Sequence, residues 1–320
     1  MNNQGGVSLV IPAFNEENGL RQTLEDCRNC LNSLKIHFEI IVVDDGSTDA
    51  TASIAEGASA RVIRHPANGG YGRALKGGIL AARYETIIIM DADGTYPVHS
   101  IPLLLEHYRQ GFDMVVGQRT GEHYEQSVFK FSLRRLLQFL VEWSCGKTIP
   151  DINSGLRVFA RTPVKAFFRH LCDTFSFTTS LTLAYMMTGR FVAYVPIAYA
   201  PRVGSSHVRL LKDSLLTLGY ILRQILYFNP LKIFLLFSLI WLGIGLSGFI
   251  FFALTRLMIS YYFGVLSLFG AFLMLGMGLL AEQIRQVVIS ISDNKTIFVQ
   301  KSDTESSATP LVGKRENDHG

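Results

Sequence analysis

The chain has 320 residues, of which 48% are hydrophobic and 18% charged, and its formal net charge is +4. The apolar residues are concentrated, because no charged side chain occurs between Lys232 and Arg256 or between Arg256 and Glu282. As helices rising about 1.5 Å per residue, both stretches would exceed the roughly 30 Å of a membrane's hydrocarbon core. This pattern excludes a wholly soluble, a disordered and a collagen-like chain.

The first half of the chain alternates short apolar runs with segments of helical periodicity. The apolar runs, rich in Val and Ile, predict strands buried on both faces at 7–12, 38–43, 60–64, 86–90 and 114–117. Helices are predicted between them near 16–35, 49–58, 71–83 and 98–110. This alternation predicts an α/β fold with a mostly parallel sheet, whose ligands gather at the carboxyl ends of the strands.

The pattern is looser in the second half. Helices are predicted near 128–145, 163–170 and 176–188, and strands near 156–160 and 191–196. Residues 208–228 form an amphipathic helix with a basic side, which can lie in the membrane interface or pack on the soluble domain. The tail from about 302 to 320 is polar and is expected to be disordered.

Basic residues are concentrated before the first apolar stretch and after the second. They are Arg209, Lys212, Arg223 and Lys232 before the first and Arg285, Lys295 and Lys301 after the second. Arg256 is the one basic residue between the stretches, so the positive-inside rule predicts two spans with both large ends cytoplasmic. We therefore expect a cytoplasmic domain at 1–207, a juxtamembrane helix at 208–230, a transmembrane hairpin at 231–282 and a cytoplasmic tail at 283–320.

Acidic residues follow three of the predicted strands. Asp91 and Asp93 directly follow the run 86–90, and paired carboxylates at a strand end suit Mg²⁺ or Mn²⁺ bound together with substrate phosphates. The run 38–43 leads into Asp44-Asp45-Gly46-Ser47-Thr48-Asp49, whose acids can accept hydrogen bonds from a ribose or a base. The first strand ends in Pro12-Ala13-Phe14-Asn15-Glu16, again turn residues with an acid.

These three motifs, in this order, resemble the inverting glycosyltransferases of family 2, which have the Rossmann-like GT-A fold. The segment His65-Pro66-Ala67-Asn68-Gly69-Gly70-Tyr71-Gly72 matches the loop that closes the donor site in that family. The resemblance implies that Asp91 and Asp93 hold the metal. It implies a donor-binding set of Pro12, Ala13, Asn15, Glu16, Asp44, Asp45, Asn68, Gly70, Asp91 and Ala92.

The second half narrows the resemblance to polyprenyl-phosphate glycosyltransferases, both dolichyl-phosphate mannose synthase-like and bactoprenol glucosyltransferase-like. It is carried by Asp151-Ile152-Asn153-Ser154-Gly155-Leu156-Arg157, by the segment 195–207 and by Phe228-Asn229-Pro230 before the spans. The resemblance implies an acceptor-phosphate set of Arg119, Ser154, Arg157, Arg202, Ser206 and His207. Among these, Arg119 and Arg202 would act in catalysis together with Asp93.

A lipid phosphate is mostly dianionic at neutral pH and needs no base to attack the anomeric carbon. Family members that attack sugar hydroxyls often have a carboxylate where this chain has Phe175-Ser176-Phe177-Thr178-Thr179-Ser180, so the missing acid agrees with a phosphate acceptor. Two positions depart from the family: Thr95 replaces a frequent Gln, and His207 replaces a Lys.

The resulting hypothesis is a membrane enzyme that moves glucose or mannose from a UDP- or GDP-sugar to polyprenyl phosphate, with inversion. The resemblance further implies the plasma membrane of a prokaryote and a homo-oligomer, and the sequence has no polybasic patch for nucleic acid. A processive polysaccharide synthase is disfavoured because neither Trp143 nor Trp241 is preceded by Arg, as its acceptor motif requires. A catalytically silent adaptor is disfavoured by the retained acids and arginines.

Overall fold

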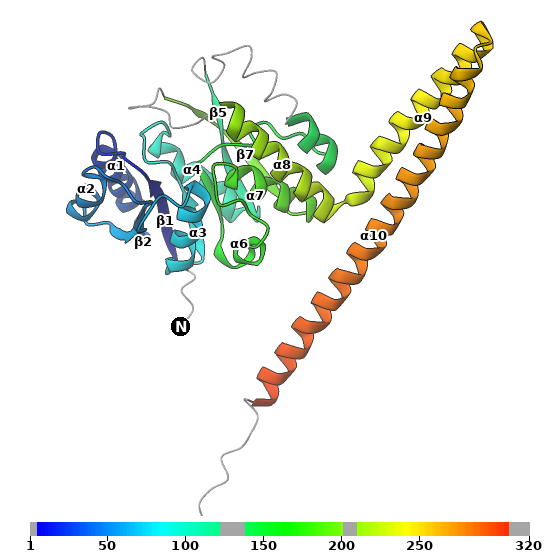
Figure 1. The fold of residues 1–320 in the computed structure, drawn as a ribbon. Helices are drawn as coiled ribbons and strands as arrows, with labels where there is room; N and C mark the ends of the chain where they lie inside the picture. Colours follow the sequence, from blue (N-terminus) through cyan, green and yellow to red (C-terminus); the bar gives the residue numbers. More distant parts are fainter. Residues whose placement is uncertain (1–4, 122–137, 201–209, 307–320) are drawn as a thin grey trace, which may run out of the picture. The chain divides into compact units, whose positions relative to one another are not determined.

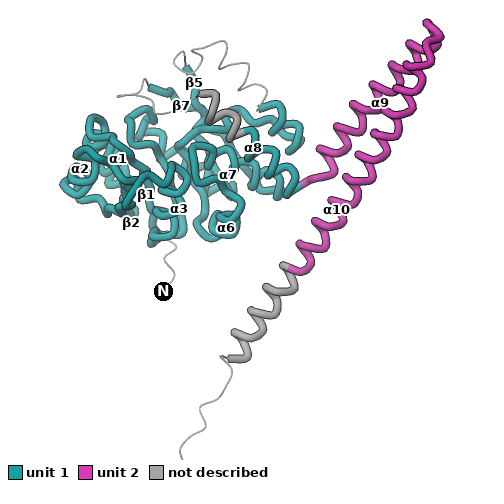
Figure 2. Tube along the Cα trace, in the orientation of Figure 1, with its two compact units in different colours: residues 1–228 teal, residues 229–320 magenta. Residues whose placement is uncertain are grey.

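The computed structural model describes residues 5–121, 138–200 and 210–306 (Figure 1). The chain divides into two units, Met1–Phe228 and Asn229–Gly320 (Figure 2). Most of the helix expected at 128–145 lies outside the described residues, and its described part, 138–145, is helical.

The first unit contains a seven-stranded sheet in the order β3-β2-β1-β4-β6-β5-β7. Its strands are β1 Gly6–Ala13, β2 His37–Asp44, β3 Arg61–Arg64, β4 Thr86–Ile89, β5 Met114–Thr120, β6 Arg157–Ala160 and β7 Val192–Ala198. All neighbouring pairs are parallel except those of β6, which runs antiparallel to β4 and β5. The mostly parallel sheet expected from the sequence is therefore confirmed.

The helices of this unit alternate with the strands, as the periodicity predicts. They are α1 Leu20–Ser33, α2 Thr51–Gly57, α3 Tyr71–Ala81, η1 Val98–Ser100, α4 Ile101–Arg109, α6 Arg161–Phe167, α7 Phe177–Met187 and α8 Leu210–Phe228. The first helix begins four residues later than expected. The preceding residues form a turn, in which Asn15 has a φ of 54° and the Glu16 carbonyl accepts hydrogen bonds from the amides of Gly19 and Leu20.

Successive strand side chains point to opposite faces of the sheet, and both faces are covered. Leu9 and Ile11 of β1 pack with Leu24 of α1, whereas Val10, between them, packs with Ile79 of α3. The result is a helix–sheet–helix arrangement in which α1, α2 and α4 pack on one face and α3, α6 and α7 on the other. Burial on both faces explains why the inner strands β1, β2 and β4 contain continuous apolar runs. The prediction of full burial is wrong for β3, because this strand lies at the edge of the sheet and exposes Arg61 and Arg64.

Helix α8 has one face packed against its own unit and another exposed. Ile221, Gln224 and Ile225 are buried, and the Gln224 side-chain amide donates a hydrogen bond to the His170 carbonyl. Leu222 and Leu226 are exposed. Helix α8 thus packs on the soluble unit, as one interpretation of the sequence predicts. Its exposed apolar side chains remain available to a membrane interface, which the other interpretation predicts.

The second unit is a pair of helices, α9 Pro230–Thr255 and α10 Met258–Ser306. Both are long and apolar enough to cross a membrane, over Pro230–Thr255 and Met258–Ile291. In the most apolar 18-residue stretch of each helix, only 11% is buried in α9 and 22% in α10. Their apolar side chains are therefore not covered as those of a soluble core helix would be. The second candidate span continues past the expected end at 282, where Glu282 and Arg285 pair one turn apart.

The two helices pack against each other through small residues. A Cβ on Gly278 would lie 2.6 Å from the Cβ of Phe234, and one on Gly248 would lie 3.1 Å from the Cα of Gly264. The Ser238 hydroxyl donates to the Ala271 carbonyl. Gly248, Gly264 and Gly278 thus allow close approach of the two helices within the hairpin.

Candidate active site

The sheet register brings the first two acidic motifs and the strand before the third to one edge. Ala13 at the end of β1 pairs with Asp44 at the end of β2, and the Asp45 amide donates to the Ala13 carbonyl at 2.9 Å. On the other side of β1, the Met90 amide donates to the Val10 carbonyl at 3.2 Å, so Asp91 and Asp93 emerge beside the same strand. The carboxyl ends of parallel strands form the usual ligand-binding edge of such folds.

A cavity of about 200 Å³ opens at this edge. Seven residues of the expected donor-binding set line it together with Asp93: Pro12, Ala13, Glu16, Asp45, Asn68, Asp91 and Ala92. The rest of its lining consists of Phe14, Tyr71, Ala74 and Phe175. The cavity therefore unites residues from three motifs that lie far apart in the sequence.

The two carboxylates of the Asp-Ala-Asp motif are each held by a neighbouring hydroxyl. The Tyr71 hydroxyl donates to Asp91 Oδ1 at 2.7 Å. Asp93 is buried, and its Oδ1 accepts hydrogen bonds from the Thr95 hydroxyl at 2.6 Å and the Thr95 amide at 3.2 Å. Thr95, the departure from the family pattern, thus orients the second carboxylate.

This donor set fits Mg²⁺ or Mn²⁺ that is bound jointly with a substrate. Among the described residues no group of three or more acidic, histidine or cysteine side chains could hold a metal ion. Two carboxylates on a cavity wall leave the remaining coordination positions to phosphate oxygens and water, which is how Mg²⁺ is usually held in phosphate-binding enzymes.

Asn15, Asp44 and Gly70, the other members of the expected donor set, do not line the cavity. Asn15 Oδ1 accepts a hydrogen bond from the Thr48 amide at 2.9 Å, and Asp44 Oδ1 accepts one from the Ser47 amide at 3.0 Å. The first bond ties the turn after β1 to the turn after β2, and the second stabilises the turn after β2 itself. Both side chains shape the loops of the donor site in this structure.

Asp45 holds the 65–72 segment against the cavity. Its carboxylate accepts hydrogen bonds from the amide of Gly69 at 3.0 and 3.1 Å and from the amide of Gly70 at 2.7 Å, and it lies 2.6 Å from His65 Nδ1. Gly70 has a φ of 101°, which strongly favours glycine. Asp45 therefore fixes the turn that delivers Asn68 and Tyr71 to the cavity.

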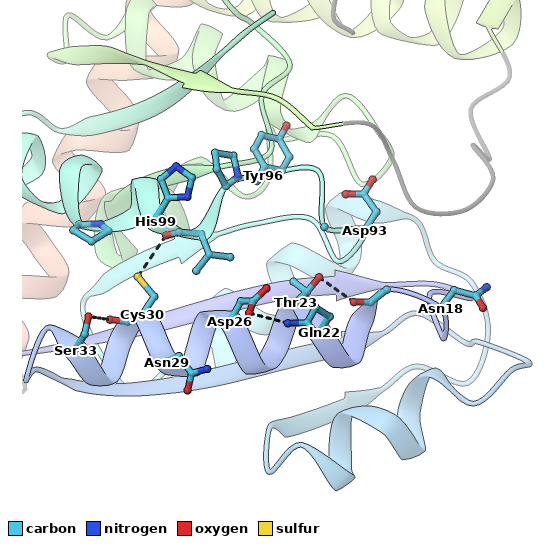
Figure 3. A pocket seen from close by; sticks show the side chains of 15 residues that line it. Asn18, Gln22, Thr23, Asp26, Asn29, Cys30, Ser33, Asp93, Tyr96 and His99 are labelled. Carbon is cyan, nitrogen blue, oxygen red and sulfur yellow. Dashed lines mark hydrogen bonds between the residues drawn. The ribbon is translucent and has the colours of Figure 1, made fainter.

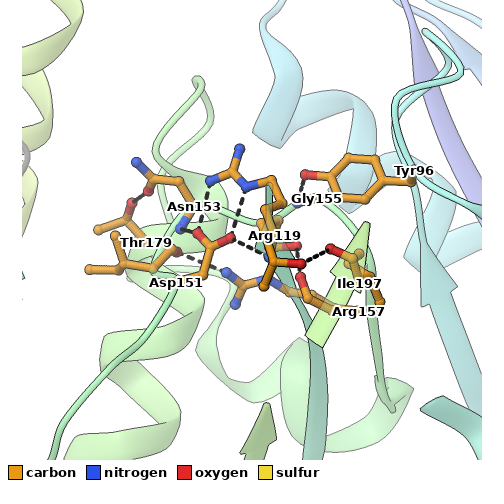
Figure 4. Close-up of polar contacts among 12 residues, drawn as sticks. Tyr96, Arg119, Asp151, Asn153, Gly155, Arg157, Thr179 and Ile197 are labelled. Atoms are coloured by element: carbon orange, nitrogen blue, oxygen red, sulfur yellow. Dashed lines mark hydrogen bonds and ion pairs between the residues drawn. The ribbon is translucent and has the colours of Figure 1, made fainter. Parts of the chain in front are cut away.

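Arg119 is oriented by Asp151 (Figure 4). The guanidinium donates two hydrogen bonds of 2.8 Å to the two carboxylate oxygens, and the Arg119 amide donates a third at 3.1 Å. Strand β5 extends to Thr120, so Arg119 lies within the strand and not after it as expected. Burial would raise the pKa of Asp151, but its hydrogen bonds to Arg119 and the charge of that side chain hold it below its ordinary value.

Tyr96 follows the Asp-Ala-Asp motif, and its ring lies 5.4 Å from that of Tyr199, whose ring also lies 5.4 Å from the Arg119 guanidinium. Its hydroxyl accepts a hydrogen bond from the Gly155 amide at 2.6 Å (Figure 4). Burial raises the pKa of Tyr96, the charge of Arg119 lowers it and that of Asp91 raises it, so both groups are within electrostatic range of one hydroxyl. Arg119 and the Asp-Ala-Asp motif therefore both lie near Tyr96, although Arg119 does not line the cavity.

Ser154 and Arg157, which the resemblance assigns to the acceptor phosphate, are fully buried. The Ser154 hydroxyl donates to the Gly117 carbonyl at 2.5 Å. The Arg157 guanidinium donates to the carbonyls of Ser154 and Ile152, both at 2.8 Å, and to the Thr182 hydroxyl at 2.7 Å. These hydrogen bonds hold the 151–157 segment in place. Because both side chains are buried and already hydrogen-bonded, they are not available to a lipid phosphate in this structure.

Arg202, Ser206 and His207, the other expected phosphate contacts, lie outside the described residues.

A second, larger hollow of about 710 Å³ lies between α1 and the loop after β4, and Asp93 lines it as well (Figure 3). The Thr23 hydroxyl of α1 donates to the Ala92 carbonyl at 3.2 Å. The Cys30 thiol donates to the Val98 carbonyl, with the sulfur 3.4 Å from the oxygen. These contacts attach the loop after β4, which carries Asp91 and Asp93, to α1.

Tyr71 and Phe175 are cavity residues that sequence reasoning missed. Tyr71 stands in the quoted 65–72 segment, and Phe175 in the segment noted only for its missing acid. Both residues could have been predicted as cavity residues, because each is an aromatic residue in a segment already assigned to the site.

The fold and site define a GT-A type transferase with a cavity at the carboxyl edge of a mostly parallel sheet. The model of glycosyl transferase family 2 matches residues 8–170, and the chain belongs to this family. It is 32% identical, over 96% of its length and 95% of the relative's, to the undecaprenyl-phosphate 4-deoxy-4-formamido-L-arabinose transferase of Pectobacterium atrosepticum. It is 31% identical, over 92% of its length and 89% of the relative's, to the same transferase of Pseudomonas aeruginosa. The expected family resemblance is thereby confirmed.

The fold is also similar to that of glucosyl-3-phosphoglycerate synthase from Mycobacterium tuberculosis, solved in complex with Mn²⁺, uridine diphosphate and glucosyl-3-phosphoglycerate. The TM-score is 0.55 at 21% identity, covering 69% of this chain and 80% of that one. The GT-A architecture expected from the motifs is thus confirmed.

Proposed function

We propose that this glycosyltransferase moves a sugar from a nucleotide diphosphate sugar to polyprenyl phosphate at the cytoplasmic face of a membrane, with inversion at the anomeric carbon. The observation that carries the proposal is the single cavity in which Asp91 and Asp93 meet the ends of β1 and β2. The similarity to undecaprenyl-phosphate transferases over nearly the whole chain supports the lipid acceptor.

The donor would lie along the cavity from the turns after β1 and β2 toward the carboxylate pair. Pro12, Asp45 and Asn68 line the cavity and belong to the motifs that the family resemblance assigns to the donor nucleotide, so we place the nucleoside beside them. Asp91 and Asp93 would hold Mg²⁺ or Mn²⁺ on the diphosphate. A bound divalent cation would neutralise part of the charge that develops on the departing diphosphate.

Arg119 is the described residue suited to the acceptor. Its planar guanidinium matches the oxygens of a phosphate, and Asp151 fixes its orientation before any substrate arrives. A phosphate monoester with a second pKa near 6 is already ionised at neutral pH and needs no base. Accordingly, residues 174–180, all described, contain no acid at the start of α7.

The relatives act on a 4-deoxy-4-formamido-L-arabinose, whereas the sequence motifs alone favour glucose or mannose. We propose the formamido-pentose as the first donor to test, linked to UDP, with UDP-glucose and GDP-mannose as alternatives. Asp93→Asn removes one metal-ligand charge and is expected to abolish transfer while the fold is kept.

The test is an assay of the purified full-length protein with labelled sugar nucleotide, undecaprenyl phosphate and Mn²⁺. Label that moves to the organic phase with wild type but not with Asp93→Asn supports the proposal. No transfer with any of the three donors contradicts it. A cellular phenotype that survives in Asp93→Asn would instead favour the adaptor hypothesis.

The apolar, uncovered faces of α9 and α10 support a membrane location. The charge asymmetry of their flanks supports a cytoplasmic position for both ends of the chain. Protease accessibility in sealed membrane vesicles of known orientation tests this topology.

A further inference from the structure

Two aromatic rings from different segments form one wall of the donor cavity. We define the aromatic wall as Tyr71, the first residue of α3, and Phe175, in the loop before α7. Their ring centroids lie 6.2 Å apart with an interplanar angle of 50°, and both residues line the cavity beside Asp91 and Asp93. Phe175 is 45% exposed, so much of its ring is accessible to a ligand.

The loop that carries Phe175 is fixed to α3. The Asp173 carbonyl accepts a hydrogen bond from the Arg73 amide at 2.8 Å. The Lys76 ammonium group donates to the Leu171 carbonyl at 2.7 Å and to the Asp173 carboxylate at 2.5 Å. At Gly72 the backbones touch, since a Cβ there would lie 2.2 Å from the Cys172 carbonyl oxygen. The exposed ring is therefore held in place before a ligand binds, which lowers the cost of binding.

The position of the wall along the cavity indicates which part of the donor it faces. The Tyr71 hydroxyl donates to Asp91 at 2.7 Å, so the wall adjoins the carboxylates. In a nucleotide sugar the sugar is attached directly to the diphosphate. If the carboxylates hold the diphosphate, the wall beside them is within reach of the sugar.

We propose that Tyr71 and Phe175 bind the transferred sugar through its C–H-bearing face, and that Phe175 is a specificity-determining residue of the donor site. This inference rests on the proposed function. Aromatic rings provide a large, rigid apolar surface, and Ala74 adds a further apolar contact in the same cavity. The wall therefore favours a sugar with an uninterrupted apolar face over one whose hydroxyls interrupt that face.

Comparing the affinity for UDP with the affinity for UDP-sugars measures the contribution of the sugar to binding separately from that of the nucleotide. Calorimetry on the full-length protein in detergent with Mn²⁺ would compare UDP with UDP-4-deoxy-4-formamido-L-arabinose and UDP-glucose. Of the two sugar nucleotides, the one that the wild type binds more tightly is expected to bind Phe175→Ala roughly 3- to 10-fold more weakly. It should leave the UDP affinity within about twofold, and Phe175→Tyr should restore sugar-nucleotide binding.

The matched control is Phe191→Ala, because Phe191 is 67% exposed and does not line the cavity. It should leave binding of all three ligands unchanged. Equal binding of the sugar nucleotides by wild type and Phe175→Ala, or an equal loss for UDP and the sugar nucleotides, would overturn the inference while leaving the proposed function standing. Failure of the wild type to bind any of these ligands would instead contradict the proposed function itself.

Discussion

Gly155 leaves the space that the Asp91 carboxylate occupies. A Cβ on Gly155 would lie 2.5 Å from Asp91 Oδ2 and 2.7 Å from Asp91 Cγ. The same glycine donates its amide hydrogen to the Tyr96 hydroxyl. The 151–157 segment thus supports the carboxylate pair through Gly155 and the arginine through Asp151.

Gly155→Ala is expected to displace the Asp91 carboxylate and to lower the rate of sugar transfer by roughly 10- to 100-fold, as loss of metal-ligand orientation does. The measurement is the steady-state rate as a function of Mn²⁺ concentration. Gly57→Ala is the control, because a Cβ at Gly57 meets nothing within 4 Å. Wild-type rates and metal dependence in Gly155→Ala would show that Asp91 does not need this space.

Tyr71→Phe keeps the aromatic ring and removes the hydroxyl that donates to Asp91 at 2.7 Å. We expect a higher Mn²⁺ concentration for half-maximal transfer, by about tenfold or more, because partners of metal ligands set their orientation. The affinity for UDP without metal should not change. An unchanged metal requirement would mean that Asp91 is positioned by other contacts.

Asp151→Asn removes the carboxylate charge that orients Arg119. The pKa of Asp151 lies below its ordinary value of 3.8, because hydrogen bonds and charge from Arg119 outweigh the effect of burial. A depressed carboxyl pKa contributes stability above the unfolded-state value and loses it as the pH falls through the folded-state value. At pH 7 the variant should therefore melt about 5 °C below wild type.

The difference in melting temperature between wild type and Asp151→Asn should persist at pH 5 and narrow below about pH 4, where the wild-type carboxyl becomes protonated. Thermal unfolding in detergent across this pH range measures it. A gap that stays constant down to pH 2, or that widens in acid, would contradict the ion-pair account. The matched control Asp26→Asn changes an acidic side chain of α1 that bonds Gln22 on the surface.

Gly278→Leu is expected to separate α9 and α10, because a Cβ at this position already lies 2.6 Å from Phe234. Gly276→Leu, two residues earlier, should be tolerated, since a Cβ there meets nothing within 4 Å. Disulfide cross-linking between cysteines introduced at Ser238 and Ala271, whose hydroxyl and carbonyl are 2.9 Å apart, reports the contact. Equal cross-linking yields in the two glycine variants would contradict the packing.

Much of the fold follows from local pattern. The apolar runs that predict β1, β2, β4 and β5 are largely buried, whereas the edge strand β3 is not, and the acids that follow the strands do meet at one edge. The start of α1 differs from expectation because the Asn15–Gly19 turn is stabilised by long-range bonds to Ser47 and Thr48. Periodicity contains no information about such contacts.

The site was predictable where a motif directly follows a strand, and less so elsewhere. Pro12, Asp91 and Asp93 line the cavity as the motifs imply. Arg157 is buried, since its guanidinium is surrounded by carbonyls of a loop that local sequence does not place. Phe175 reaches the cavity only because its loop packs on α3, a contact between residues about a hundred positions apart.

The carboxylate pair Asp91 and Asp93 is expected to bind a divalent cation together with the donor diphosphate. Electron paramagnetic resonance titration of Mn²⁺ into the full-length protein, with and without UDP, measures this directly. We expect wild type to bind one Mn²⁺ more tightly when UDP is present, and Asp91→Asn and Asp93→Asn to lose at least about tenfold in that affinity. Mn²⁺ binding that is independent of UDP, or equal in wild type and both variants, would contradict the account.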